Sequence, residues 1–178
     1  DGTRIGETTT PAADDFQVLG HADPDFTAGI RTQVTFGRFD AGLLLRWEQG
    51  GTVFNNTALV YSTKSNALQD KNFLASALDD PTGITQPAIY SSRWLEGRSF
   101  LRLQNITLGF TFDLPGYLSG LGNSARLYAS ADNLFLLTGY SGYDPEVLIG
   151  AQGIAARGVD YLNYPRQRVF TTGVRLSF

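Results

Sequence analysis

Along much of this chain every second residue is apolar, and that spacing restricts the fold to β-strands with one apolar face. The clearest example runs from Phe26 to Phe36, where polar residues and glycine stand between the apolar ones. Successive side chains of a strand point to opposite faces of a sheet, so the pattern predicts one apolar and one polar face. The positions expected on the apolar face are Phe26, Ala28, Ile30, Thr32, Val34 and Phe36.

Five stretches follow this pattern and are predicted to be strands. Their predicted bounds are residues 26–36, 39–47, 100–114, 125–135 and 166–178. In the third stretch the alternation is out of phase before Asn105, because Leu101 and Leu103 do not continue the apolar set that begins at Ile106. An extra residue in one strand shifts the phase in this way, so we expect a β-bulge there.

The connections between these strands alternate between short and long. Gly37-Arg38 is a two-residue turn and residues 115–124 form a medium turn, whereas residues 49–98 and 137–165 form long loops. Within the first long loop, residues 72–78 are predicted to form a helical turn or two. Outer-membrane barrels have short periplasmic turns and long extracellular loops. The order of the connections therefore favours a transmembrane β-barrel with both long loops outside the cell.

The composition is compatible with a barrel and argues against several other classes. The chain has no apolar run of about 18 residues, which excludes transmembrane helices. Cysteine is absent, which rules out disulfides and thiolate metal sites, and the net charge of −3 argues against a nucleic-acid partner. Five strands cannot close a barrel, and open strand edges are not tolerated in lipid. The chain is therefore predicted to be part of a larger barrel.

Four phrases of the sequence stand in a recognisable order. They are Val18-Leu19-Gly20 with Pro24, Phe26 and Gly29 after it; FLRLQNITLGFT at residues 100–111; SADNLF at 130–135 followed by LTGYSGYDPE at 137–146; and Tyr164-Pro165 followed by a strand that ends in GVRLSF at 173–178. Over about residues 16–178, this set resembles the end of the SusC/RagA family of TonB-dependent outer-membrane transporters. Asp132 stands where glutamine is commoner in the family, and Phe100 where tyrosine is commoner. Neither departure alters the resemblance.

The resemblance implies the fold, the location and the function. It implies an all-β chain that supplies the C-terminal five antiparallel strands of a multi-pass outer-membrane barrel of about 22 strands, with residues 1–25 as an extracellular loop or tail. It further implies import of oligosaccharides or peptides together with a SusD-like surface lipoprotein. TonB would act through an N-terminal region that this chain lacks. No catalytic, cofactor-binding or metal-binding residue is expected.

Two groups of residues are candidates for contact with solute or partner. The first group lies on the polar strand faces, which would line the barrel lumen, and consists of Arg31, Gln33, Arg46, Glu48, Arg126 and Arg175. These residues could instead serve lumen hydration and packing against the plug. The second group consists of aromatic residues of the long loops, Tyr61, Tyr90, Trp94, Tyr140 and Tyr143. Those of the YSGYDPE phrase could instead hold their loop in shape.

Two other readings remain open at this point. A soluble β-sandwich that binds glycans through exposed aromatic residues would use the same alternation to fill a closed core. An enzyme at the barrel rim would need a nucleophile and a base that converge. The sequence shows no such pair, and the single histidine, His21, is expected to be a solvated loop residue.

Overall fold

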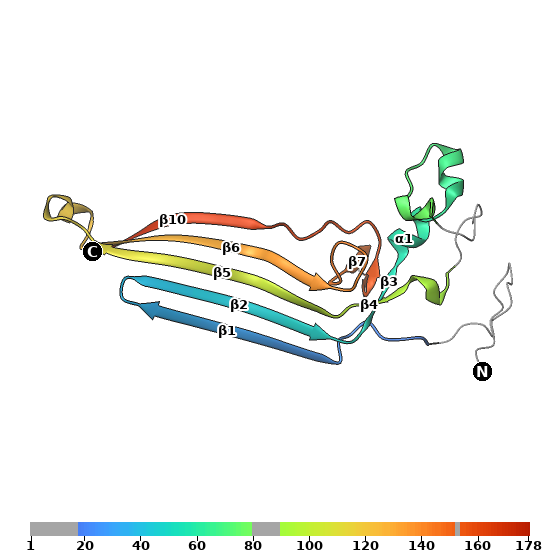
Figure 1. Ribbon diagram of the computed structural model, residues 1–178, viewed down its shortest axis with the longest axis horizontal. Helices are drawn as coiled ribbons and strands as arrows, with labels where there is room; N and C mark the ends of the chain where they lie inside the picture. The colour runs from blue at the N-terminus through green and yellow to red at the C-terminus, as the bar shows by residue number, and fades with distance from the viewer. Residues whose placement is uncertain (1–17, 80–89, 152–153) are drawn as a thin grey trace.

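The main feature of the computed structural model is one antiparallel sheet of five strands in the order β1-β2-β5-β6-β10 (Figure 1). The structure describes residues 18–79, 90–151 and 154–178, so residues 1–17 of the expected tail lie outside the described residues. The strands are β1 (Phe26–Phe36), β2 (Phe39–Gln49), β5 (Phe100–Asp113), β6 (Ser124–Thr138) and β10 (Val169–Ser177). The all-β fold class is confirmed, and each strand lies within three residues of its predicted bounds.

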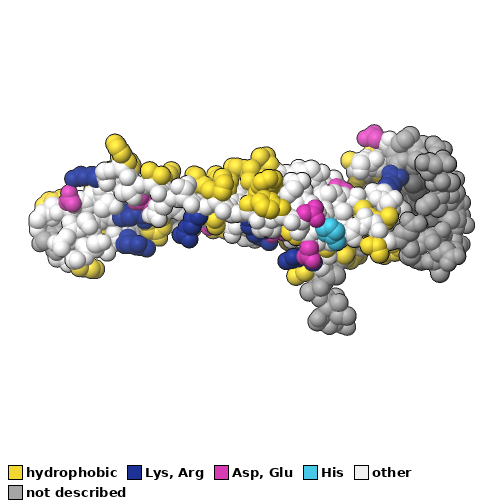
Figure 2. Space-filling model, turned by 90° about the horizontal axis from the view of Figure 1, so that it is seen from below, with side chains coloured by type: hydrophobic (Ala, Val, Ile, Leu, Met, Phe, Trp, Pro, Cys, Tyr) yellow, Lys and Arg dark blue, Asp and Glu magenta, His cyan; other side chains and the backbone are white. Residues whose placement is uncertain are grey.

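The register of the sheet collects the apolar side chains on one face. Residues opposite one another in an antiparallel pair point to the same face. Val34, Ala41, Leu108, Ala129 and Thr172 partner one another in turn across all five strands. Figure 2, which views the sheet from its β1 side, shows hydrophobic side chains gathered on one side and most of the charged ones on the other. We call these two surfaces the apolar face and the polar face.

The apolar face is exposed. Phe36 is 84% exposed, Val34 59% and Phe170 70%, and no second sheet of the described residues covers them. Monomeric soluble proteins rarely expose an apolar surface that crosses a whole sheet. A β-sandwich would bury these side chains, so the structure does not support the soluble alternative.

A bulge accounts for the phase change in the third predicted strand. Against β2, the register of β5 passes from Leu103 to Asn105 while β2 advances by one residue, which leaves Gln104 as an extra residue. Against β6, the two residues Asn133 and Leu134 stand opposite Gln104. On the β6 side, Asn133 takes a positive φ of 51°, a conformation that asparagine tolerates better than most residues. The predicted bulge is confirmed. Because of it, Leu103 and Ile106 share the apolar face although they are three residues apart.

The short and long connections lie at opposite ends of the sheet. The turn at Gly37 and the 3₁₀ turn Gly116–Leu121 lie at one end together with the C-terminal Phe178 (Figure 1). Both long loops lie at the other end. Gly37 has a φ of +59°, which suits the tight hairpin turn predicted there.

The two long loops fold together into one unit, which we call the loop body. Its centre is a sheet of three short strands in the order β4-β3-β9: β3 (Thr52–Asn55) and β4 (Leu95–Gly97) come from the first loop, and β9 (Val159–Asp160) from the second. β3 pairs in parallel with β9, so the two loops are joined through their backbones. Val53 of β3 forms a small buried core with Tyr140 and Val147 of the second loop.

Short helical segments complete the first loop. The helix α1 (Asn56–Tyr61) begins where the Asn55 side chain accepts a hydrogen bond from the Ala58 backbone N–H at 2.8 Å. 3₁₀ turns follow at Lys64–Gln69, Ala75–Ala77 and Ser92–Trp94, of which Ala75–Ala77 lies within the helical turn expected at 72–78. In the second loop, β7 (Leu148–Ala151) and β8 (Ile154–Arg157) form a hairpin. No helix in the described part of the chain is long and apolar enough to span a membrane.

The sheet has two open edges. Among the described residues, β1 pairs only with β2, and β10 only with β6. Each edge therefore presents unpaired backbone N–H and C=O groups, which cost several kcal/mol apiece in hydrocarbon. An apolar face in contact with lipid requires further strands to pair with both edges.

Adjacent residues of β5 provide a direct test of the two faces. Ile106 lies in the middle of the apolar face, and Thr107 points to the polar face. If the apolar face meets lipid, Ile106→Lys should lower the free energy of unfolding by about 2–4 kcal/mol, because a lysine at the centre of the lipid face loses its hydration. Thr107→Lys should cost far less. Urea unfolding of the full-length barrel in lipid vesicles measures both values, and equal losses would contradict the assignment of the faces.

Candidate functional site

Charged side chains converge where the polar face of the sheet meets the loop body. The members of this ion cluster are Arg46 and Glu48 of β2, Arg98 just before β5, Arg102 of β5, Asp144 and Glu146 of the second loop, and Arg166 just before β10. They come from five separate segments of the chain. The bulge at Gln104 contributes directly, because it allows Arg102 to lie on the polar face between two leucines of the apolar face.

Arg102 is the centre of the cluster. Its Nη2 donates to both carboxylate oxygens of Asp144, at 2.7 and 2.9 Å, and lies 3.0 Å from Oε2 of Glu146. The side chains of Arg102 and Asp144 are only 3% and 9% exposed. Charge-assisted contacts between buried groups are strong when the geometry is good, and removing one partner leaves an uncompensated charge. These contacts fix the YSGYDPE segment to the sheet.

The neighbouring pairs extend this network toward β2. Arg98 Nη2 donates to Glu48 at 3.0 Å, and Arg46 Nη2 donates to Glu48 at 3.1 Å and also to Glu146. The guanidinium groups of Arg46 and Arg102 each lie 5.3 Å from the centroid of the Phe100 ring. Arginine over an aromatic face is a favourable cation–π arrangement. It offsets the repulsion between Arg46 and Arg102, which are direct cross-strand neighbours.

The cluster carries an excess of positive charge. Four arginines face three carboxylates, which leaves a formal charge of +1. The Nε–H groups of Arg46, Arg98 and Arg102 are buried and have no hydrogen-bond acceptor within the described residues. Arg166 stands at the rim with a side chain 44% exposed, 3.4 Å from Glu146. The arrangement can bind anionic or carbonyl groups but offers no nucleophile with a base. The described residues also contain no group of acidic or histidine side chains that could hold a metal.

A second polar site lies nearer the short turns. Arg126 donates through Nε to Asp40 at 2.7 Å and makes a second contact through Nη2, and its guanidinium lies 5.4 Å from the Tyr128 ring centroid. Gly109 lies between these side chains, and any larger residue would collide with the pair. A polar hollow of about 420 Å³ beside the pair is lined by Arg31 and Gln33, among others.

Every predicted polar-face residue lies on that face. Arg46 and Glu48 belong to the ion cluster, Arg31, Gln33 and Arg126 line the polar hollow, and Arg175 is an exposed residue beside Arg126 on β10. Their contact with solute or plug stays a prediction.

The predicted loop aromatics divide into buried and exposed residues. Tyr140 is 5% exposed and donates from its hydroxyl to Asp160 at 2.5 Å, and Trp94 is 7% exposed. Burial, together with the hydrogen bond to Asp160, raises the pKa of Tyr140 well above its usual range. Tyr61 is half-buried, whereas Tyr90 is 71% and Tyr143 is 77% exposed. Only the exposed pair can meet a partner without rearrangement, and burial assigns Tyr140 and Trp94 to packing.

Tyr143 borders a small cavity that the sequence did not predict. The cavity of about 110 Å³ lies at the edge of the ion cluster and is also lined by Asp160, Asn163, Tyr164 and Arg166. Tyr164 is 97% exposed. The exposed rings of Tyr143 and Tyr164 are suited to stacking. The side chains of Arg166 and Asn163 and the nearby carboxylates can form hydrogen bonds beside them.

Sequence reasoning missed the buried partners of the ion cluster. Arg98, Asp144 and Glu146 lie in predicted loops, and loop residues carry no alternation from which a facing direction can be predicted. One signal was present: Arg102 stands between Leu101 and Leu103 in a strand. An arginine at that place needs a buried partner or a polar face, and the phase change indicated that the face was ambiguous.

The ion cluster generates a prediction about the second loop. Arg102→Leu should leave Asp144 without its main partner and Glu146 without one of its three arginines. The loss should release residues 140–147 from the sheet, at a local cost of about 3–5 kcal/mol. Hydrogen–deuterium exchange of the full-length transporter should show this as faster exchange in the loop while the strands stay protected. Arg175→Leu, at an exposed site of the same face, serves as the control and should change little. Equal exchange in the two variants would show that the cluster does not hold the loop.

Comparison with curated proteins finds relatives that are named TonB-dependent receptors. TonB-dependent receptor P3 of Formosa agariphila is 32% identical over 184 residues, which cover 97% of this chain and 18% of that protein. TonB-dependent receptor SusC of Bacteroides thetaiotaomicron is 31% identical over 163 residues, which cover 86% of this chain and 15% of that protein. The chain thus spans less than a fifth of the length of these relatives. No protein-family model matches it.

Solved structures of outer-membrane importers have a fold similar to that of this chain. The RagAB peptide importer in its "open-open" state matches with a TM-score of 0.75 at 24% identity, over 96% of this chain and 19% of that one. Its "closed-closed" state matches with a TM-score of 0.73 at 23% identity. At this identity the likeness shows the fold alone, and the names of the sequence relatives supply the family. The chain belongs to the SusC/RagA-type TonB-dependent receptors of the outer membrane, and its five-stranded sheet and two long loops are part of their β-barrel.

Proposed function

We propose that this chain forms the solute-receiving side of an outer-membrane importer for oligosaccharides or peptides, which works with a SusD-like surface lipoprotein as its lid. The observation that carries the proposal is the loop body: two long loops fold into one unit at a single end of the sheet. SusC and the RagAB peptide importer are the relatives that suggest nutrient import. Energy from TonB would enter through parts of the protein outside this chain.

The loop body has the rigidity that a docking rim requires. Long loops lose conformational entropy when they become ordered, so internal contacts must compensate. Here the compensation comes from the parallel pairing of β3 with β9, from the core of Val53, Tyr140 and Val147, and from the contacts of Arg102 with Asp144. A preordered surface gains affinity because less entropy is lost on binding.

The exposed residues of the loop body suit a partner or a polar solute. Tyr90 stacks on Phe54, with ring centroids 5.6 Å apart, and keeps most of its surface free. Tyr143 and Tyr164 are exposed and line the small cavity. Tyrosine is enriched at protein interfaces, and its ring stacks on sugars and peptides while its hydroxyl forms hydrogen bonds. The ion cluster below adds a positive charge toward the polar face.

The segment after α1 is the part of the loop body farthest from the sheet (Figure 1). A lid that approaches from outside the cell would meet it early. Leu74 N donates to Tyr61 O at 2.8 Å, so the two ends of residues 62–73 are adjacent and can be joined directly. This geometry permits removal of the protruding segment without disturbing the core of the body.

Replacing residues 62–73 with two glycines in the full-length transporter should leave the barrel inserted but reduce co-purification of the lid about tenfold, because part of the docking surface is lost. Solute uptake should fall with it. Pull-down through a tag on the lid and uptake of labelled solute measure the two effects. Removing residues 52–92 is the more severe deletion for comparison, because it also removes β3 and with it Val53 of the core of the loop body.

Tyr117→Phe serves as the control for lid binding, since Tyr117 is an exposed residue of the short turn at the opposite end of the sheet from the excised segment. A shortened transporter that retains its lid and imports normally would show that this segment only shields the barrel.

A further inference from the structure

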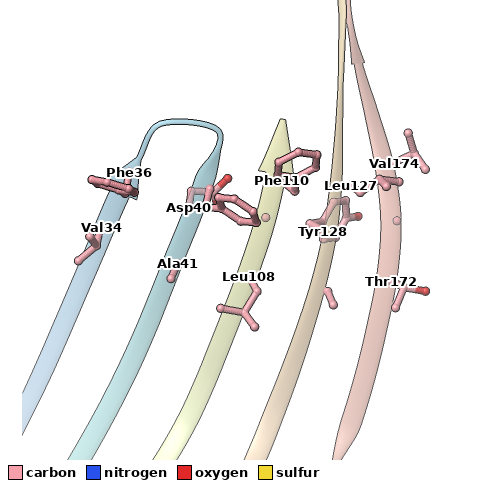
Figure 3. Close-up of a pocket in the computed structure, with 14 residues that line it drawn as sticks. Val34, Phe36, Asp40, Ala41, Leu108, Phe110, Leu127, Tyr128, Thr172 and Val174 are labelled. Carbon is pink, nitrogen blue, oxygen red and sulfur yellow. The ribbon is translucent and has the colours of Figure 1, made fainter. Parts of the chain in front are cut away.

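A cavity larger than the polar hollow described above lies on the apolar face of the sheet. It is an open hollow of about 810 Å³ near the short-turn end of the sheet, and it spans all five strands. Figure 3 shows its lining: Val34, Ala41, Leu108 and Thr172 lie across neighbouring strands, with Phe36 and Phe110 nearer the turn. In the outer membrane this face meets hydrocarbon.

The hollow follows from the sizes of the side chains in two adjacent rows. The row along its floor contains small residues on three strands and consists of Val34, Ala41, Leu108, Ala129 and Thr172. The next row toward the turns is bulky and consists of Phe36, Phe39, Phe110, Leu127 and Val174. The two rows are about 6.7 Å apart, which is two residues of strand. The bulky row therefore forms a raised border beside a low floor.

The bulky border stands close to the turn end of the sheet, and therefore close to the membrane surface. Phe39 and Phe110 pack with ring centroids 4.7 Å apart, and Phe36 is 84% exposed. The turn that carries Arg38 begins directly after Phe36. Arg38 is 61% exposed and donates to Asp113 at 2.9 Å through one nitrogen, which leaves further guanidinium donors at the surface. The cationic side chain of Arg38 thus follows the bulky row by two residues, on the side of the turn.

This arrangement matches the chemistry of one lipid molecule. A phospholipid has an anionic phosphate a few ångströms from the start of its acyl chains, and here a cation lies the same short way from an apolar hollow. We propose that the hollow holds one acyl chain of a membrane phospholipid, whose phosphate is bound by Arg38. The leaflet is the one at the short-turn end of the barrel.

The attraction in this site comes from packing. Lipid tails are as apolar as leucine, so burial of apolar surface supplies no net drive within a bilayer. A chain that fills a fixed hollow instead gains dispersion contacts that it lacks over a flat surface. The rows of the sheet cannot rearrange to close the hollow because strand pairing fixes them. This separates a retained lipid from lipids that merely surround the barrel.

Filling the hollow tests the proposal. The full-length transporter is extracted from the outer membrane, stripped of loosely held lipid in detergent, and titrated with phosphatidylethanolamine in native mass spectrometry. We expect the natural sequence to retain one lipid per barrel. Ala129→Phe combined with Thr172→Phe fills the floor with apolar atoms and should weaken retention about tenfold. Ala28→Phe adds the same side chain to the apolar face near the loop end, outside the hollow, and should change nothing.

A second variant leaves the hollow intact. Arg38→Gln removes only the exposed cation and should also weaken retention, so the proposal remains testable if the double variant does not insert. Equal retention in all variants overturns the proposal, as does equal loss in Ala28→Phe, which would mean unselective contact with lipid. A dimer that is broken by the filled hollow and holds no lipid would assign the surface to a second barrel and would also overturn it.

Discussion

The pairing of backbone groups is the constraint on which this structure depends. In hydrocarbon every N–H and C=O must find a partner within the protein, and antiparallel strands achieve this by repeating one pattern of pairing from edge to edge. That pattern fixes the register, and the register in turn fixes which side chains face lipid. Val34 and Thr172 lie in one row of the apolar face although they stand at opposite edges of the sheet. The charged groups are confined to the other face and to the ends.

The bulge at Gln104 shows how a local irregularity serves a distant site. With a regular strand, Arg102 would lie on the same face as Ile106 and would enter lipid at a cost of several kcal/mol. The extra residue reverses the phase, so the arginine turns toward Asp144 and Glu146. One inserted residue therefore keeps the charge of Arg102 out of lipid and allows this arginine to hold the second long loop against the sheet. The same bulge keeps Leu101 and Leu103 on the apolar face.

Most of the sheet could be predicted from the sequence, because the alternation of apolar and polar residues indicates directly which face of the sheet each side chain occupies. The strands, the bulge and the order of turns and loops all carry a local signal, and the family phrases add the barrel. The loop body could not be predicted in the same way. Its sheet joins Phe54 to Val159, and its core joins Val53 to Tyr140. These contacts depend on where the strands end in space, so no short window of sequence shows them. Tyr140 illustrates the limit: its place in the loop left both partner contact and a role in holding the loop in shape open, and the fold buries it against Asp160.

The parallel pairing of β3 with β9 also has a consequence for the order of assembly. β3 follows β2 in the chain, whereas β9 precedes β10, the last strand of the sheet. Contacts between such distant segments form slowly, because a large loop must close before they gain anything. The chain cannot complete this small sheet until strands β2, β5 and β6 lie side by side. The loop body is therefore expected to form late in folding. It can form only when the strands of the main sheet have paired in the correct register.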